Sequence, residues 1–342
     1  MGQGLQDMIR RIGIDIGTSN IRIYIPQRGV VVDEPNVVAI NVTNQKVVAV
    51  GAEAKQMLGR TPEGIMAANP LNDGVIASYK TTKQMLEMYF SKILGRVRLF
   101  KPDIIVNCPV GATSTERKAI LDAVESSGAK KVYLFKSPLA AALGSGLDIS
   151  SSIGNMIIDV GGGKTEVAVI ALGDIVSFSS VRYGGKKMDE AIIDFIRKKR
   201  NLVIGEQTAE YAKIEVGAAI PQKKDNKIEI SGSNTISGLP ESILIHTNEI
   251  ALALKPVLNE IILAVKQVLQ KTPPELSSDV MDKGIVITGG AAKIRDFDEL
   301  LTKVTGVPCQ LIDESQLTAI KGIGLATENF DEFIEALSWR SK

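Results

Sequence analysis

Two aspartates in this 342-residue chain each end an apolar run and precede a turn rich in glycine and small polar residues. Asp15 precedes the turn Gly17–Asn20, and Asp159, 144 residues later, precedes the turn Gly161–Lys164. Glycine lets a backbone approach an anion closely and present several N–H groups to it. A carboxylate repels phosphate but suits a hydrated Mg²⁺ held by water and phosphate oxygens. The two turns therefore predict a polyphosphate site, with Asp15 and Asp159 as its metal residues.

A third glycine-rich turn, Gly289–Ala292, follows the apolar run Gly284–Thr288.

Two other nucleotide sites fit the sequence poorly. The run Gly162–Thr165 ends in the Gly-Lys-Thr of a P-loop, but the P-loop pattern needs a glycine where Ile158 stands inside the apolar run. The Gly-x-Gly-x-x-Gly pattern is absent after the first strand, which disfavours a Rossmann dehydrogenase.

Composition excludes several other classes of protein. The chain is 44% hydrophobic and 23% charged, as in globular proteins, and its net charge of +1 supplies no overall field to attract nucleic acid. Cys108 and Cys309 lack ligand-like spacing, which indicates a reducing compartment, and the single histidine, His246, argues against an imidazole metal site or a serine-hydrolase triad. No apolar run approaches the roughly 20 residues that span a bilayer, and there is no secretory segment, so we expect a cytoplasmic protein.

The elements around the two aspartates repeat the same design. Each apolar run and turn is followed by a second β-rich run, Ile21–Ile25 or Glu166–Ile170, which predicts two β-hairpins that open two similar halves. Helical and strand patterns alternate between them, as in α/β domains. We expect helices over 81–94, 114–127, 138–146, 208–220 and 248–269, and strands over 103–108 and 131–135.

This alternation predicts two α/β lobes, 1–145 and 146–317. A small insertion in each lobe is expected at about 33–65 and about 185–242. The terminal segment 318–342 contains the helical apolar spacing of Phe330–Trp339 and is expected to pack back on the first lobe.

The series of motifs resembles the actin, sugar kinase and DnaK-type chaperone superfamily, and within it the MreB family of bacterial actin homologues. The resemblance covers roughly residues 10–325. Its most specific stretches are Gly13–Thr18, Leu58–Pro62, Pro70–Ile76, Asp159–Ile170, Met188–Ile193 and Thr272–Leu276. It implies an actin-like, ribonuclease H-like duplicated fold with two lobes around a cleft that binds Mg-ATP or ADP.

The resemblance also implies roles for individual residues. The first phosphate turn is lined by Thr18, Ser19 and Asn20, and the second by Gly161, Gly162, Gly163 and Lys164. Glu210 and Lys213, one helical turn apart, match the positions that hold ribose and adenine; taken alone, they would be an exposed ion pair. The turn that closes over the nucleotide consists of Gly289, Gly290, Ala291, Ala292 and Lys293.

Two positions depart from the family where water is activated. Ser137, before Pro138, stands where the family usually has a glutamate that orients the attacking water, and Lys164 stands where it usually has threonine. Serine is not a carboxylate base, whereas an ammonium beside phosphate is a strong hydrogen-bond donor. Ser137, Lys164 and Asp159 are the candidate catalytic residues, and we expect ATP binding with slow hydrolysis, unless Lys136, Glu166 or an ordered water substitutes.

The resemblance implies self-association into filaments for cell shape or motility at the inner face of the membrane, with other MreB-like paralogues as further partners. Anionic membrane contact is expected through Leu99 and Phe100 in their basic surroundings, and through a short amphipathic helix over Met1–Arg11. Two alternatives to membrane contact remain equally open: Leu99 and Phe100 could pack on their own domain, and the N-terminal segment could be frayed. A small-molecule kinase of the same fold and a non-polymerising scaffold remain alternatives; a DnaK-type chaperone would need a further domain.

Overall fold

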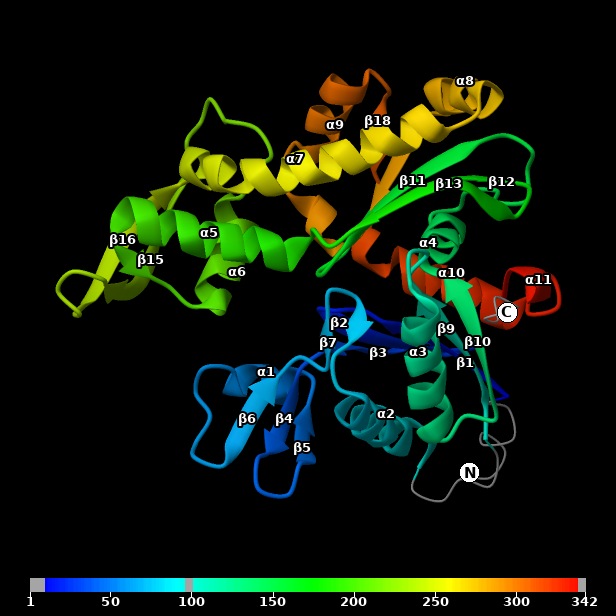
Figure 1. Ribbon diagram of the computed structural model, residues 1–342, viewed down its shortest axis with the longest axis horizontal. Coiled ribbons are helices and arrows are strands. Elements are labelled where there is room, and N and C mark those ends of the chain that lie inside the picture. Colours follow the sequence, from blue (N-terminus) through cyan, green and yellow to red (C-terminus); the bar gives the residue numbers. More distant parts are fainter. Residues whose placement is uncertain (1–9, 96–100, 338–342) are drawn as a thin grey trace. The chain divides into compact units, whose positions relative to one another are not determined.

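The computed structural model describes residues 10–95 and 101–337 (Figure 1). The described chain divides into two compact units. The first runs over residues 10–153, 170–176 and 317–337, and the second over residues 154–169 and 177–316. No helix in these described ranges is long and apolar enough to cross a membrane.

The first unit is built on a five-stranded sheet of order β10-β9-β1-β2-β3. Strands β1 (Arg11–Ile16), β9 (Asp103–Cys108) and β10 (Lys131–Lys136) are parallel neighbours, whereas β2 (Asn20–Ile25) and β3 (Gly29–Pro35) continue the sheet in antiparallel pairs. Because β1, β9 and β10 are parallel, their carboxyl ends meet at one edge, where Asp15, Asn107 and Ser137 lie.

Helices cover both faces of this sheet. The buried side chains of α2 (Tyr79–Leu94) and α3 (Ser114–Ser126) share a core with the isoleucines of β1 and β2. On the other face, α10 (Thr318–Glu328) packs on β1 and on α4 (Ser137–Gly144). The contact is close, because a Cβ built on Gly13 would lie 2.7 Å from Ile323 of α10.

A small sheet of order β5-β4-β6 is inserted after β3. It comprises β4 (Val38–Asn41), β5 (Lys46–Val50) and β6 (Ile65–Ala68), with α1 (Ala52–Met57) beside it and a separate small core. The short hairpin β7 (Leu71–Asn72) and β8 (Val75–Ile76) leads from it to α2.

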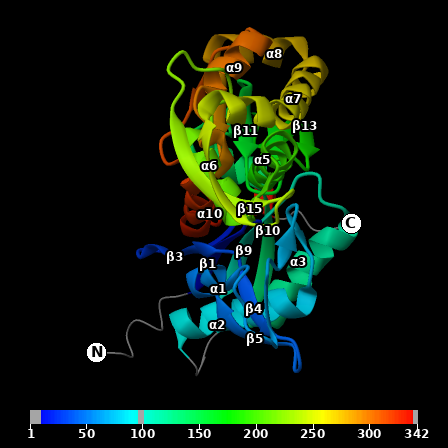
Figure 2. The same cartoon turned by 90° about the vertical axis from the view of Figure 1, so that its left-hand side faces the viewer.

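The second five-stranded sheet has the order β13-β12-β11-β17-β18. Its strands are β11 (Asn155–Val160), β12 (Thr165–Ala171), β13 (Asp174–Val181), β17 (Ile285–Thr288) and β18 (Cys309–Leu311). The apolar faces of α5 (Gly185–Arg200), α6 (Glu206–Val216), α7 (Thr247–Lys271) and α9 (Phe297–Thr305) share one large core with it, and α8 (Pro274–Lys283) follows α7 (Figure 2).

A second small sheet, of order β14-β15-β16, lies within the second unit. It comprises β14 (Leu202–Val203), β15 (Lys227–Asn234) and β16 (Pro240–His246).

The expected helices and strands are confirmed within a few residues, with two corrections at the chain ends. The helix expected over Met1–Arg11 is wrong at its end, because Arg11 opens strand β1; its first nine residues, like Leu99 and Phe100, lie outside the described residues. The helix expected over Phe330–Trp339 is limited, where the chain is described, to α11 (Ile334–Leu337). The Phe330 ring meets the Tyr133 ring edge-on at 4.9 Å and lies under the Arg11 guanidinium at 4.1 Å.

Candidate nucleotide site

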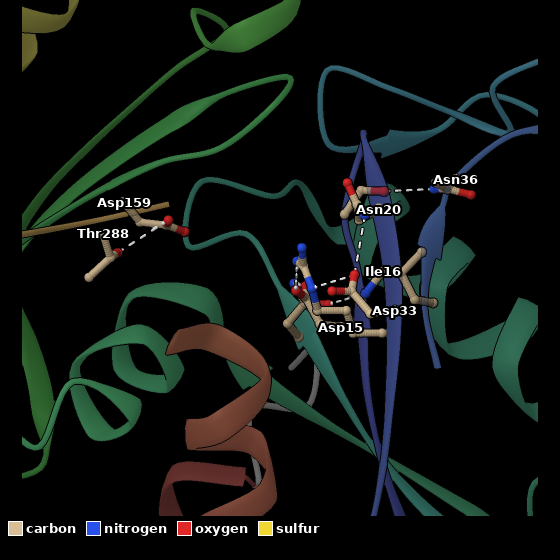
Figure 3. Close-up of polar contacts among 10 residues, drawn as sticks. Asp15, Ile16, Asn20, Asp33, Asn36, Asp159 and Thr288 are labelled. Carbon is tan, nitrogen blue, oxygen red and sulfur yellow. Dashed lines mark hydrogen bonds and ion pairs between the residues drawn. The ribbon is translucent and has the colours of Figure 1, made fainter. Parts of the chain in front are cut away.

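The first glycine-rich turn joins β1 to β2 and holds Asp15 at its base. The turn is closed by a 2.9 Å hydrogen bond from the Gly17 N–H to the Asn20 carbonyl. Asp15 is buried, accepts a 2.6 Å hydrogen bond from the Asn107 amide, and lies 3.5 Å from the Arg22 guanidinium (Figure 3). Arg22 faces Asp15 in the strand register. These two donors fix the orientation of the carboxylate.

Two later segments of the first unit support the first turn. The side-chain amide of Asn36 donates to the Gly17 carbonyl at 2.6 Å, and its backbone N–H donates to the Ser19 carbonyl at 2.8 Å. The Thr18 hydroxyl accepts from the Gly74 N–H at 2.8 Å. Thr18 is therefore a buried, hydrogen-bonded part of the turn.

The second turn, between β11 and β12, is closed in the same way. The Gly161 N–H donates to the Lys164 carbonyl at 2.9 Å, so the turn atoms repeat the arrangement at Gly17 and Asn20. At the base of the turn, Asp159 accepts a 3.3 Å hydrogen bond from the Thr288 hydroxyl of β17 (Figure 3).

The start of α5 supports this second turn. The N–H groups of Gly185 and Lys186 donate to the carbonyls of Gly161 and Gly162 at 3.0 and 2.8 Å. Gly184 allows this approach, since a Cβ there would lie 2.4 Å from the Gly161 oxygen.

The side chain of Lys164 forms an ion pair with Glu166. The sequence pattern indicated Glu166 only as a residue that could replace the missing water-orienting glutamate. The Lys164 ammonium lies 2.6 Å from the Glu166 carboxylate, whose side chain is only 1% exposed. Lys164 is thus the cationic partner of a buried acid, in addition to its place in the second glycine-rich turn. The signal was present in the sequence, because residues two apart entering a strand share one face.

The closing turn also lies at this edge of the second sheet. Gly289 has φ +93°, and a Cβ there would lie 2.2 Å from the Val160 oxygen and 2.7 Å from an Asp159 carboxylate oxygen. Its N–H donates to the Ser315 carbonyl at 2.9 Å. A short 3₁₀ helix, Gly290–Lys293, follows. The second unit therefore brings Asp159, Gly161–Lys164 and Gly289–Lys293 together.

Lys213 on α6 forms an ion pair with Asp189 on α5, a residue for which the sequence pattern predicted no role. Its ammonium lies 2.7 Å from Asp189 and donates to the Gly185 carbonyl at 3.2 Å. Burial raises the pKa of Asp189 to about 6; Lys213 opposes this rise, and Glu210 and Glu206 add to it. Glu210 lies one turn before Lys213 on α6, as expected.

Ser137 opens α4 directly after β10. It is 2% exposed, and its hydroxyl makes no hydrogen bond to any residue in the described part of the chain. The position where the family usually carries a glutamate is thus a small buried site without a carboxylate.

Asp15 in the first unit and Asp159 in the second are each suited to contact a metal ion through its water ligands. The described residues contain no group of three or more histidines, cysteines, aspartates or glutamates that could hold a metal ion. Asp15 and Asp159 are each oriented by a hydrogen-bond donor. Mg²⁺ in nucleotide sites usually keeps several waters and takes only one or two carboxylates.

Comparison with known proteins gives one consistent family. The family model described as MreB/Mbl protein matches residues 9–335. The cell shape-determining protein Mbl of Bacillus subtilis (strain 168) is 43% identical over 323 residues, which cover 94% of this chain and 97% of that protein. The cell shape-determining protein MreB of Escherichia coli (strain K12) is 43% identical over 325 residues, 94% of each chain.

Solved structures give the same fold. The crystal structure of MreB5 of Spiroplasma citri bound to ADP has a TM-score of 0.90 at 33% identity and covers 95% of this chain and 98% of its own. The MamK double helical filament, at 19% identity and a TM-score of 0.77 over 93% and 99% of the chains, shares the fold. The fold is actin-like, as the sequence predicted, and the chain belongs to the MreB/Mbl family.

Proposed function

We propose that this chain is an adenine-nucleotide-binding, cell shape-determining protein that polymerises into filaments. The observation that carries the proposal is the pair of identically closed glycine turns, each with an oriented aspartate at its base. Two relatives are named cell shape-determining proteins, and structures of MreB5 of Spiroplasma citri carry ADP or AMPPNP. The MamK structure is titled a double helical filament.

Each turn contributes backbone N–H groups and small polar side chains to phosphate. Thr18, Ser19 and Asn20 supply these groups in the first turn, and Gly161–Lys164 supply them in the second. Glu210 and Lys213 contact the adenosine. The turn Gly289–Lys293 closes over the nucleotide. Mg²⁺, when bound, neutralises phosphate charge, and Asp15 and Asp159 orient its water ligands.

Hydrolysis is proposed to be slow. Water near the terminal phosphate meets no carboxylate at Ser137, and the Lys164 ammonium is already neutralised by Glu166. Loss of one group that positions water costs roughly 100-fold in rate, which corresponds to about 3 kcal/mol of barrier. The chain would act as an ATP-dependent polymer of low turnover.

The filament is proposed to lie in the cytoplasm at the inner face of the membrane. Leu99, Phe100 and the N-terminal segment are the proposed lipid contacts, and MreB-like paralogues are proposed as further subunits. Burial of two such side chains yields about 2 to 3 kcal/mol each, so many linked copies are needed for stable binding.

The decisive experiment is titration calorimetry with Mg-ATP on Asp159→Asn, an isosteric change that keeps the Thr288 contact and removes the charge. We expect ATP affinity to fall at least 10-fold in Mg²⁺ and to change much less in EDTA, since the carboxylate acts through the metal. Asp194→Asn is the control, because Asp194 is exposed and, within the described part of the chain, forms an ion pair with Arg197 one turn away. Equal Mg-ATP affinity for wild type and Asp159→Asn would contradict the metal assignment.

A further inference from the structure

Asp189 is a partly buried acid for which the proposed function has no role. Its side chain is 15% exposed and lies 2.7 Å from the Lys213 ammonium, whose own side chain is 11% exposed. The two residues come from different helices, α5 and α6, so helix packing rather than local sequence brings them together. A carboxylate withdrawn from water in this way costs desolvation energy, which the attraction to the Lys213 ammonium offsets.

Lys213 stands at a junction between three parts of the second unit. Besides Asp189, its ammonium reaches the carbonyl of Gly185, the first residue of α5. The N–H of the same Gly185 donates to the Gly161 carbonyl in the second phosphate turn. A continuous chain of polar contacts therefore runs from α6 through the start of α5 to the turn.

The electrostatic surroundings make Asp189 necessary for this arrangement. The charged groups that act on Asp189 are Lys213, Glu210 and Glu206, all from α6. Strand β14 and helix α7, which also pack on α5, add buried apolar side chains to the shared core, and Glu249 of α7 pairs with Arg200, the last residue of α5. Lysine has four rotatable bonds and a compact charge, so an unheld ammonium samples many positions. Only the ionised carboxylate gives it a fixed charge partner beside the Gly185 carbonyl.

We propose that Asp189 is a positioning residue that holds the Lys213 ammonium for the adenosine end of the nucleotide and links that end to the second phosphate turn. This inference rests on the proposed nucleotide binding. It assigns no contact between Asp189 and the nucleotide itself.

Ionisation of Asp189 makes the effect dependent on pH. Burial raises the pKa of the Asp189 carboxyl from its ordinary value to about 6. The group is therefore charged at pH 7.5 and mostly protonated at pH 5.5. Protonation weakens the hold on Lys213, and ATP affinity should fall as the pH is lowered through about 6. ATP titrates in the same range, so the quantity to compare is the affinity ratio of wild type to Asp189→Asn.

The test measures Mg-ATP binding to wild type, Asp189→Asn, Lys213→Met and the double variant by calorimetry. At pH 7.5 we expect Asp189→Asn to bind ATP about 10-fold more weakly, and the same change to have little further effect once Lys213 is methionine. At pH 5.5 the ratio of wild type to Asp189→Asn should approach one. Inorganic tripolyphosphate should bind all four proteins alike, because it lacks the adenosine.

Asp189→Glu keeps the charge, so we expect it to recover much of the affinity at pH 7.5, and thermal unfolding establishes that each variant is folded. Full additivity of the two substitutions, or a ratio that does not change with pH, would overturn the positioning role while leaving ATP binding intact. If folded wild-type protein binds no ATP, the proposed function fails, and this inference fails with it.

Discussion

Arg22 and Glu166 occupy equivalent places in the two hairpins, each seven residues after the aspartate at the base of its turn. In the first hairpin the cation at this place neutralises acids, because Arg22 lies 2.9 Å from Asp33 and 3.5 Å from Asp15. In the second hairpin the same place carries a buried acid. A buried carboxylate needs a cation within reach. Lys164 supplies that charge, which gives it a structural reason to replace a neutral residue.

This pairing predicts that Lys164→Thr lowers stability. Removing one partner of a buried pair leaves an uncompensated charge, and the expected cost is about 3 kcal/mol in the free energy of unfolding. Lys164→Thr combined with Glu166→Gln removes both charges and should recover most of that loss. Urea unfolding followed by circular dichroism measures the difference. A single variant as stable as wild type would show that Glu166 does not depend on the ammonium.

At the scale of elements, each of the two glycine-rich turns is held by chain segments that lie elsewhere in the sequence. Asn36 and Gly74 hold the first turn and the start of α5 holds the second. These hydrogen bonds hold the turns in place without a ligand, and such preorganisation lowers the entropic cost of binding.

The sequence predicted elements better than the contacts between them. Both ends of strand β9 agree with the prediction, because the apolar core Ile104–Val106 of a parallel strand is a recognisable apolar run. The helix predicted to end at Arg11 is wrong at that residue, which begins strand β1. The helix-like spacing of the residues before Arg11 outweighed the β pattern of the residues after it. The pairing of Asp189 with Lys213 depends on how α5 and α6 pack, which neither helix's own pattern encodes.

Helices α4 and α10 approach so closely that glycine is required at their contact. A Cβ on Gly322 would lie 1.8 Å from the Ala140 oxygen, and one on Gly144 would lie 1.8 Å from the Thr318 oxygen. These neighbours are backbone atoms and have little freedom to move. We expect Gly322→Ala to lower stability by about 3 kcal/mol or more through overpacking.

Gly205→Ala is the matched control, because no atom lies within 4 Å of the added Cβ and its φ of −82° suits alanine. Thermal unfolding of the two variants checks the prediction. Similar melting temperatures for Gly322→Ala and wild type would mean that the helices separate at little cost.

For the whole molecule, polymerisation and membrane binding are expected to depend on each other. One copy gains roughly 4 to 6 kcal/mol from burying two large apolar side chains, which gives at best millimolar to tens of micromolar binding before ordering costs. Linked copies on one filament bind far more tightly without any new contact. Membrane binding should therefore appear only under conditions in which the protein pellets in Mg-ATP.

Liposome flotation tests this dependence with Leu99→Ser/Phe100→Ser. We expect wild-type protein in Mg-ATP to float with vesicles that contain anionic lipid and to stay behind with neutral vesicles, since Leu99 and Phe100 lie among basic residues in the sequence. The double variant should pellet as wild type does but float several-fold less. Ile236→Ser/Leu239→Ser is the control, because these side chains are 80% and 65% exposed in the turn between β15 and β16 and belong to no proposed lipid contact. If the control variant loses flotation and Leu99→Ser/Phe100→Ser keeps it, the membrane-binding surface lies on the second unit. If both variants float like wild type, the N-terminal segment remains as the lipid contact.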